Sequence, residues 1–312
     1  MDKNKSIIFL TGHNGLVGSA ILRALKKKGY KNVITKTRKQ LDLLNQKKVF
    51  EFFSKKKIDF VFNAAARVGG INANNTKKAD FIYENLTIQN NIIYASYKNN
   101  VKNLIFLGSS CVYPKIVNRK IKEDDLLTGS LEKTNEPYAV AKIAGIVTCK
   151  SFNEQFKTNY KCLMPCNIYG PNDNYDLKTS HFFPALIKKI HIAKHKQSKT
   201  VTIWGNGKPK RELLFSEDLA EACIYFIDKK TKETLINIGS TCENTVKDFA
   251  KILIKELNYK GKIKFDKSKP NGTQRKKLDL TLASKYKWRA KTNLSKGIQK
   301  TYESFLKNNV IK

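Results

Sequence analysis

The sequence has no long hydrophobic run. None of its apolar stretches approaches the ~20 residues that a membrane-spanning helix needs. The opening run Ile7–Leu10 is too short for the hydrophobic part of a signal peptide, and it leads directly into a glycine-rich turn, so it predicts a buried strand. We therefore expect a chain that stays in the cytoplasm and has no membrane partner.

Paired cysteines are also missing. The six cysteines are scattered along the chain, and none shows the CxxC spacing of zinc or redox sites. Most of them lie in apolar segments, which is typical of free thiols in a reducing compartment. The sequence therefore predicts no disulfide and no bound metal.

Arginine is scarce, although the formal net charge is +34. Only seven of the 60 basic residues are arginine, and the lysines are spread along the whole chain. Proteins that read the grooves of nucleic acids depend on the bidentate fork of arginine. The distribution therefore favours a solvated coat of lysines over a nucleic-acid-binding face, and this charge would still attract polyanionic ligands.

What the first half of the chain does contain is a regular alternation of short apolar runs and amphipathic segments. This is the pattern of parallel strands joined by crossover helices. Strands are predicted at Ser6–Leu10, Asn32–Ile34, Phe60–Asn63, Leu104–Leu107 and Tyr160–Met164. Helices are predicted at Gly15–Lys28, Gln46–Lys56, Ala79–Asn99 and Pro137–Lys157.

The pattern predicts an α/β fold in two parts. Residues 1–170 are expected to form a doubly wound parallel sheet of the Rossmann type, to which a strand and a helix near 217–240 return. After residue 170 the chain breaks into polar, turn-rich pieces. The segments 171–216 and 241–312 are therefore expected to form a smaller C-terminal lobe that binds the substrate.

A glycine-rich turn lies between the first predicted strand and the first predicted helix. Its glycines follow the spacing GxxGxxG, one residue wider than the GxGxxG fingerprint of dinucleotide-binding proteins. Glycines let the backbone approach a pyrophosphate, and a helix N-terminus adds free N–H groups. Such a turn can be purely structural, but its place between a strand and a helix favours a nucleotide. The residues expected to bind it are Gly12, His13, Asn14, Gly15, Leu16, Val17 and Gly18.

The end of the second predicted strand indicates which dinucleotide is bound. An acidic residue here would hold a free ribose 2′-hydroxyl. The segment 34–39 contains no acid and carries a basic cluster with Arg38. The guanidinium of Arg38 suits a 2′-phosphate, so the predicted cofactor is NADPH/NADP+ rather than NAD.

Three polar residues lie where this architecture places reacting groups. Tyr138 and Lys142 are one turn apart on the same face of a predicted helix, and Ser109 follows the fourth predicted strand. A neighbouring ammonium should lower the tyrosine pKa from its usual ~10 and ease proton transfer. A Tyr-x-x-x-Lys pair alone arises by chance in a lysine-rich chain, but together with Ser109 and the glycine turn it predicts a catalytic site.

Segments spread over the whole chain resemble the GDP-L-fucose synthases, which are extended short-chain dehydrogenases/reductases. Several of them, such as FLGSSCVYPK and SKPNGTQRK, are far more specific than the glycine turn. The resembling segments are Gly12–Ile21, Ala64–Asn75, Ala79–Asn91, Phe106–Lys115, Asn135–Gly145, Met164–Asn174, His181–Leu186, Trp204–Glu212 and Ser268–Lys276.

The resemblance implies a reaction in two stages. GDP-4-keto-6-deoxy-D-mannose would be epimerised at C3 and C5 and then reduced at C4 by NADPH, which gives GDP-L-fucose. Cys111 and His181 resemble the acid/base pair of the epimerisation, and Tyr138 resembles the proton donor of the reduction. If residues 109–111 are extended, the side chains of Ser109 and Cys111 point the same way.

The resemblance also implies binding residues and an oligomer. The cofactor residues beyond the glycine turn and Arg38 are Leu107, Gly108, Ser109, Ser110, Lys142, Pro165, Asn167, Ile168 and His181. The substrate residues are Asn167, Lys189, Trp204 and Arg211. Relatives pack the helices that correspond to Ala79–Asn99 and Pro137–Lys157 into a four-helix bundle about a two-fold axis, so a homodimer is expected.

The sequence departs from the family at two positions where relatives often carry arginine. Asn14 removes one partner for a 2′-phosphate, and Lys189 offers a point charge in place of a bidentate fork. A GDP-colitose-type synthase would share nearly every motif and stays open as an alternative.

Two further alternatives fit the motifs less well. An NAD-dependent hexose 4-epimerase would need neither Cys111 nor His181. A nucleic-acid-binding protein of the same fold would have no use for Ser109, Tyr138 and Lys142 together.

Overall fold

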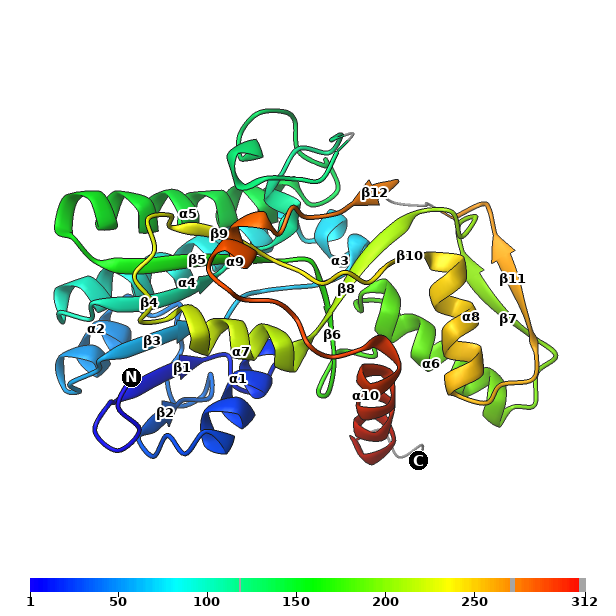
Figure 1. Ribbon diagram of the computed structural model, residues 1–312, viewed down its shortest axis with the longest axis horizontal. Coiled ribbons are helices and arrows are strands. Elements are labelled where there is room, and N and C mark those ends of the chain that lie inside the picture. Colours follow the sequence, from blue (N-terminus) through cyan, green and yellow to red (C-terminus); the bar gives the residue numbers. More distant parts are fainter. Residues whose placement is uncertain (118, 270–272, 309–312) are drawn as a thin grey trace.

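The computed structural model describes residues 1–117, 119–269 and 273–308. Its centre is a six-stranded sheet with strand order β2-β1-β3-β4-β5-β9, in which all neighbouring strands run parallel (Figure 1). The strand order reverses at β1, which lies between β2 and β3, and this confirms the predicted Rossmann-type α/β fold. The strands are β1 (Ile8–Thr11), β2 (Val33–Thr35), β3 (Phe60–Asn63), β4 (Asn103–Leu107), β5 (Asn159–Pro165) and β9 (Leu235–Ile238).

Helices cover both faces of this sheet. On one face α4 (Lys78–Lys98) packs between α2 (Gln46–Ser54) and α5 (Glu136–Phe156), and on the other α1 (Leu16–Lys27) packs against α7 (Ser216–Phe226) (Figure 1). The amphipathic sequence of each helix explains its placement. In α1, for example, the buried residues Ile21, Ala24 and Leu25 recur at helical spacing and form one apolar face.

The sheet and its helices enclose the first of two hydrophobic clusters. Apolar side chains of the strands, such as Phe9, Phe62 and Phe106, are buried at its centre. Leu278 and Trp288 belong to the same cluster, so the chain returns to the sheet around α9 (Thr281–Lys285).

The second cluster lies in a smaller lobe beside the carboxyl edge of the sheet (Figure 1). Phe183, Phe249 and Phe305 pack at its centre. β6 (Asn167–Tyr169) connects the two parts, because it follows β5 in the chain and pairs with β8 of the lobe. The lobe elements are α6 (Phe182–His195), β7 (Thr200–Trp204), β8 (Lys210–Phe215), β10 (Glu243–Thr245), α8 (Val246–Glu256), β11 (Lys262–Asp266), β12 (Arg275–Lys276) and α10 (Leu294–Asn308). The domain boundaries at residues 170, 216 and 240 stay a prediction.

The predicted strands and helices agree with the structure to within two residues, and the largest shifts are at the start of β1 and at the end of α2. β1 begins at Ile8 rather than Ser6, because the Ser6 hydroxyl accepts a hydrogen bond from the Asp2 N–H at 2.9 Å and closes a turn. Three short helices complete the fold, namely α3 (Ile71–Thr76), η1 (Ser110–Val112) and η2 (Glu123–Asp125).

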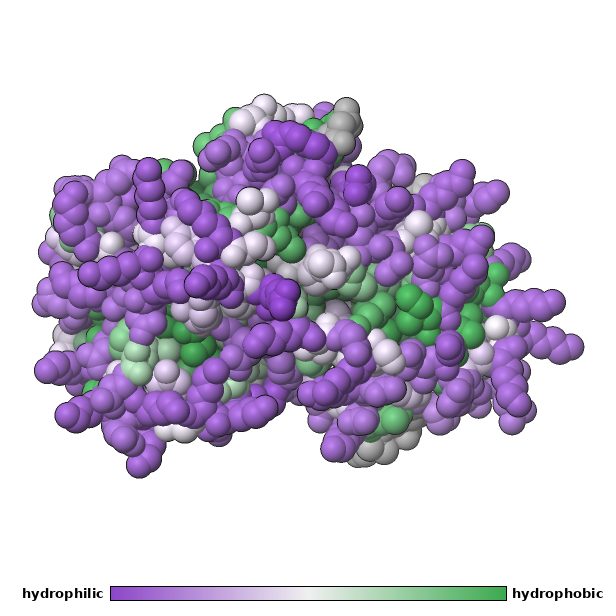
Figure 2. All heavy atoms as spheres, viewed as in Figure 1, coloured by the Kyte–Doolittle hydropathy of each residue, from purple (hydrophilic) through white to green (hydrophobic). Residues whose placement is uncertain are grey.

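The surface is strongly hydrophilic over most of the face in Figure 2, as the lysine content leads one to expect. Within the described ranges no helix is both long and apolar enough to cross a membrane. All six cysteines are free thiols.

Candidate active site

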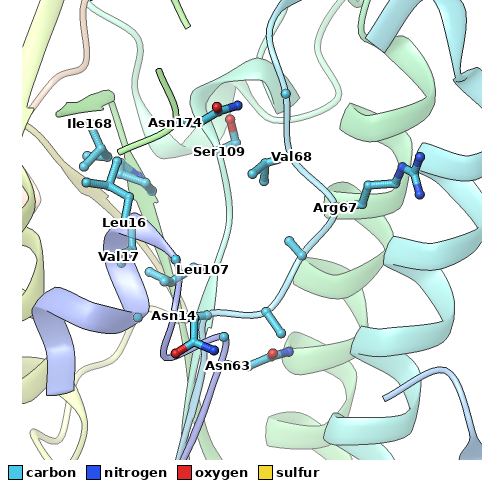
Figure 3. A pocket seen from close by; sticks show the side chains of 18 of the residues that line it. Asn14, Leu16, Val17, Asn63, Arg67, Val68, Leu107, Ser109, Ile168 and Asn174 are labelled. Carbon is cyan, nitrogen blue, oxygen red and sulfur yellow. The ribbon is translucent and has the colours of Figure 1, made fainter. Parts of the chain in front are cut away.

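A cavity of about 850 Å³ opens at the carboxyl edge of the sheet. Asn14 and Asn63 lie at one end of the view in Figure 3, and Ser109 and Asn174 lie at the other. Its lining includes residues at the ends of β3, β4 and β5, which is where doubly wound sheets bind their ligands.

The glycine turn forms a cradle at the first end of this cavity. Gly12 has a φ of +67°, and a Cβ on it would lie 2.6 Å from the Ala64 carbonyl oxygen. A Cβ on Gly18 would lie 2.0 Å from the Gly12 carbonyl oxygen, so neither position accepts a side chain. The turn leads into the N-terminus of α1, as a pyrophosphate site requires.

Two buried polar atoms around the glycine turn also fit a polar ligand. Among the described residues, the Nδ1 of His13 and the Nδ2 of Asn63 have no hydrogen-bond partner, and both residues line the cavity. Buried polar groups are normally paired. The turn and these two atoms together fit a dinucleotide.

Arg38 lies at the rim of the cavity, with Lys36 and Thr37 beside it. Its side chain is exposed and pairs with Asp42 at 3.7 Å. An exposed guanidinium on the lining of the cavity is placed to meet a phosphate. Arg38 would have to break its ion pair with Asp42 to bind one.

Ser109, Tyr138 and Lys142 are brought together on the cavity wall, as the sequence predicts. Lys142 is buried, donates a hydrogen bond to the Leu107 carbonyl at 2.8 Å, and has its Nζ 5.8 Å from the centre of the Tyr138 ring. Burial lowers the pKa of Lys142 to about 8.

The predicted lowering of the Tyr138 pKa by Lys142 is wrong. Burial raises the pKa of this phenol above its usual range, the neighbouring Cys111 adds to the rise, and a hydrogen bond with Ser109 only partly opposes it. The phenol therefore keeps its proton at neutral pH, which is the state that a proton donor needs.

His181 lies on the lobe side of the cavity, where it immediately precedes α6. His181 is an exposed residue, yet the protein atoms around its imidazole desolvate the ring enough to lower its pKa, so the ring is neutral at physiological pH. It thus faces the same space as Ser109 and Tyr138, although it comes from a different part of the chain.

Cys111 is buried next to this group and does not itself line the cavity. The expected extended stretch is wrong, because residues 110–112 form η1 and the Ser109 hydroxyl accepts the Cys111 N–H at 3.5 Å. Burial raises the pKa of the Cys111 thiol, and the positive charges of Lys276 and Lys142 oppose the rise.

Three of the residues predicted to bind substrate lie on the lobe, outside the cavity lining. The Nζ of Lys189 lies 5.3 Å from the centre of the half-exposed Trp204 ring. Arg211 donates to the Thr273 carbonyl at 2.6 Å, and burial lowers its pKa. Asn167 does line the cavity, and its amide donates to the Glu212 carbonyl at 3.2 Å.

The sequence prediction missed Lys276. This residue is paired with Arg211 between β12 and β8, and its ammonium group interacts electrostatically with both Arg211 and Cys111. It therefore connects the lobe residues with the catalytic group. The signal for it was the motif at Ser268–Lys276, of which residues 270–272 lie outside the described part of the chain.

The structure brings the whole predicted cofactor set to one cavity, since each of its residues lines the wall. It adds several residues at the end of β3 and in the segments that follow β3 and β6. The added residues include Asn63, Arg67, Val68, Asp173, Asn174 and Thr179. Most of them lie within the segments that resemble the family, so those motifs could also have predicted these residues.

This fold and this site define a dinucleotide-dependent enzyme of the Rossmann class. The chain belongs to the NAD dependent epimerase/dehydratase family, which residues 8–239 match.

Relatives that align over nearly all of this chain are more specific than the family match. The GDP-L-fucose synthase of Escherichia coli (strain K12) is 44% identical, and the alignment covers 98% of each chain. The GDP-L-colitose synthase of Yersinia pseudotuberculosis is 43% identical over 97% of this chain and 99% of the relative.

Solved structures agree with the sequence relatives. A GDP-6-OMe-4-keto-L-xylo-heptose reductase from C. jejuni superposes with a TM-score of 0.93 at 36% identity, with 99% of each chain covered. A GDP-L-fucose synthetase from Naegleria fowleri bound to NADP superposes with a TM-score of 0.90 at 26% identity, over 100% of this chain and 97% of that one.

Proposed function

We propose that this protein converts GDP-4-keto-6-deoxy-D-mannose to GDP-L-fucose by epimerisation at C3 and C5 and NADPH-dependent reduction at C4. The observation that carries the proposal is the convergence of Ser109, Tyr138 and His181 on one cavity, with Cys111 buried next to it and donating its backbone N–H to the Ser109 hydroxyl. A simple reductase would need the first two residues only. The relatives that share the family support the same substrate class.

NADPH would be held by the glycine turn, Arg38 and the residues at the ends of β4 and β5. When bound, it supplies the hydride. Lys142 would orient the nicotinamide ribose, and Ser109 would hold the sugar carbonyl against the phenol of Tyr138. Because burial keeps that phenol protonated, Tyr138 can give its proton to the C4 oxygen as the alcohol forms.

Cys111 and His181 would exchange the protons at C3 and C5, which the C4 carbonyl makes acidic. Burial favours the neutral thiol and the neutral imidazole. One group can then donate a proton while the other accepts one, as inversion of a carbon centre requires.

One assay tests this proposal directly. Purified protein is mixed with NADPH and GDP-4-keto-6-deoxy-D-mannose, the cofactor absorbance is followed, and the product sugar is identified by NMR. A fucose-configured product is expected. No consumption of NADPH, or a product without inversion at C3 and C5, would contradict the proposal.

A GDP-colitose-type activity is a second candidate, because the Yersinia relative matches nearly as well as the E. coli relative. The two candidates differ in whether C3 of the sugar carries a hydroxyl. The same assay with the 3-deoxy keto-sugar separates them by the ratio of kcat/KM for the two substrates.

Arg38 should set the preference for NADPH. Loss of a charge-assisted contact at an exposed site should lower kcat/KM for NADPH about 10-fold in Arg38→Ala and leave that for NADH nearly unchanged. Lys39→Ala, which alters a neighbouring cation outside the cavity lining, is the control. Equal cofactor preference in wild type and Arg38→Ala would remove Arg38 from the site.

We further infer a homodimer built from α4 and α5. These helices pack against each other and expose large apolar side chains, namely Tyr83 and Tyr94 on α4 and Val140 and Val147 on α5. A second copy of the same helix pair would cover them in a four-helix arrangement. We also infer a cytoplasmic location, for which the free cysteines are the supporting observation.

Val147→Asp should therefore convert the dimer to a monomer, because it would bury a carboxylate in an apolar interface. Light scattering after size-exclusion chromatography measures the mass. Leu306→Asp alters an exposed apolar side chain on α10 and serves as the control. A wild-type protein that is monomeric at micromolar concentration would refute the inference.

A further inference from the structure

A diglycine segment after β3 joins the two sides of the cavity. Gly70 donates its N–H to the Thr179 carbonyl at 2.8 Å. A Cβ on Gly70 would lie 2.4 Å from the Ser180 carbonyl oxygen, and one on Gly69 would lie 2.9 Å from the Cβ of Ala73. The φ of Gly70 is −68°, which any residue can adopt. Glycine is therefore required here for close approach and not for backbone conformation.

On the sheet side this segment is fixed by buried amides. Asn74 donates to the carbonyls of Gly69 at 2.6 Å and Gly70 at 3.1 Å. Asn85 on α4 exchanges two hydrogen bonds of 3.0 Å with the backbone of Arg67. The Arg67 side chain points toward α4 (Figure 3), where it pairs with two acidic residues.

On the lobe side the partner segment is a compact turn. Asp176 Oδ1 accepts both the N–H and the hydroxyl of Thr179 at 2.9 Å, and Asn174 donates to the same hydroxyl at 3.0 Å. The Ser180 N–H donates to the Asp176 carbonyl at 2.8 Å. His181 follows directly as the N-cap residue of α6. A displacement of Thr179 would thus be passed to His181.

The diglycine segment also contacts the support of Tyr138. A Cβ on Gly69 would lie 3.3 Å from the ring of Phe81. That ring packs edge-on against Tyr138, with centroids 6.2 Å apart. One short segment thus contacts the turn that precedes His181 and the Phe81 ring that packs on Tyr138.

We propose that Gly69, Gly70 and Asn74 form a brace that fixes the position of His181 relative to Tyr138. The inference rests on the proposed function, in which these two side chains act in succession on one sugar. The three brace residues are positioning residues, because they act through the backbone of Thr179 and Ser180.

The test compares Gly70→Ala with Gly129→Ala. A Cβ on Gly129 would meet only Pro114, at 3.3 Å, away from the cavity. The chain has four histidines, so the His181 ring signal can be assigned by NMR with His181→Asn and titrated. Desolvation lowers the pKa of His181 in the intact site. Because Gly70→Ala displaces the backbone next to His181, the ring chemical shifts and the titration midpoint of His181 should both change in this variant, and neither should change in Gly129→Ala.

The same variants are assayed for exchange of deuterium at C3 and C5. Gly70→Ala should lower the exchange rate about 10²-fold, the loss expected from a displacement of ~1 Å. The Kd for NADPH should change far less than the exchange rate, since the glycine turn is untouched and only the His181 side of the cavity is displaced.

An unchanged titration of His181 in Gly70→Ala would overturn the brace, whether or not activity falls. If Gly70→Ala does not fold, Asn74→Ala replaces it, with the exposed neighbour Asn75→Ala as its control. The titration needs no turnover. A wild-type protein that exchanges no deuterium would therefore refute the proposed function and still leave the brace open to this measurement.

Discussion

Tyr138→Phe should lower the rate of NADPH oxidation by the keto-sugar roughly 10²–10⁴-fold, which is the range that general acid catalysis supplies. The variant loses the phenolic proton that burial retains in the wild type. The ring itself, with its edge-on packing on Phe81, is kept, so the fold and the affinity for NADPH should be preserved. Stopped-flow absorbance at saturating NADPH follows the oxidation of the cofactor, which includes any delay from the preceding epimerisation.

Tyr175→Phe is a matched control for this loss. Its hydroxyl is also buried, but it has no hydrogen-bond partner among the described residues and lies outside the cavity lining. The control should reduce the keto-sugar at nearly the wild-type rate. Near wild-type reduction by Tyr138→Phe itself would show that another group gives the proton.

Cys111→Ser and His181→Asn should separate the epimerisation from the reduction. Serine places a poorly acidic hydroxyl where a titratable thiol stood, and asparagine cannot accept a proton in the same way. In deuterated water both variants should incorporate far less deuterium at C3 and C5 than wild type. They should release a 6-deoxy sugar with incomplete inversion, or almost no product, because an uninverted ketone can be badly placed for hydride transfer.

Cys242→Ser provides the control for the cysteine variant. This thiol is only partly buried, lies in the lobe, and accepts a weak hydrogen bond from Asn244 at 3.7 Å. It should exchange deuterium normally. Full exchange and a fucose-configured product from Cys111→Ser would show that Cys111 is only a packed core thiol.

The parts of the fold that local sequence determines were predictable. The apolar run before Gly12 and the amphipathic run after it determine β1 and α1, and the glycine spacing between them determines the cradle. Tyr138 and Lys142 share one helix, so their proximity needs only helical geometry. These features depend on residues close together in the chain.

The parts that long-range register determines were not predictable. The approach of Lys276 to Cys111 depends on β12 pairing with β8, and the brace depends on Gly70 meeting Thr179 from more than 100 positions away. The direction of the Tyr138 pKa was predicted wrongly because burial outweighs the nearby charge, and the degree of burial is a property of the packed chain.

The two hydrophobic clusters have a thermodynamic consequence. Each part of the molecule has its own core, so each can in principle open with its own free energy. A ligand that contacts both the glycine turn and His181 is lost when either part opens, and it therefore couples the two unfolding events. At 100 times its Kd such a ligand adds about 2.7 kcal/mol to the cost of opening either part. The two parts would then unfold together more cooperatively when this ligand is bound than when it is absent.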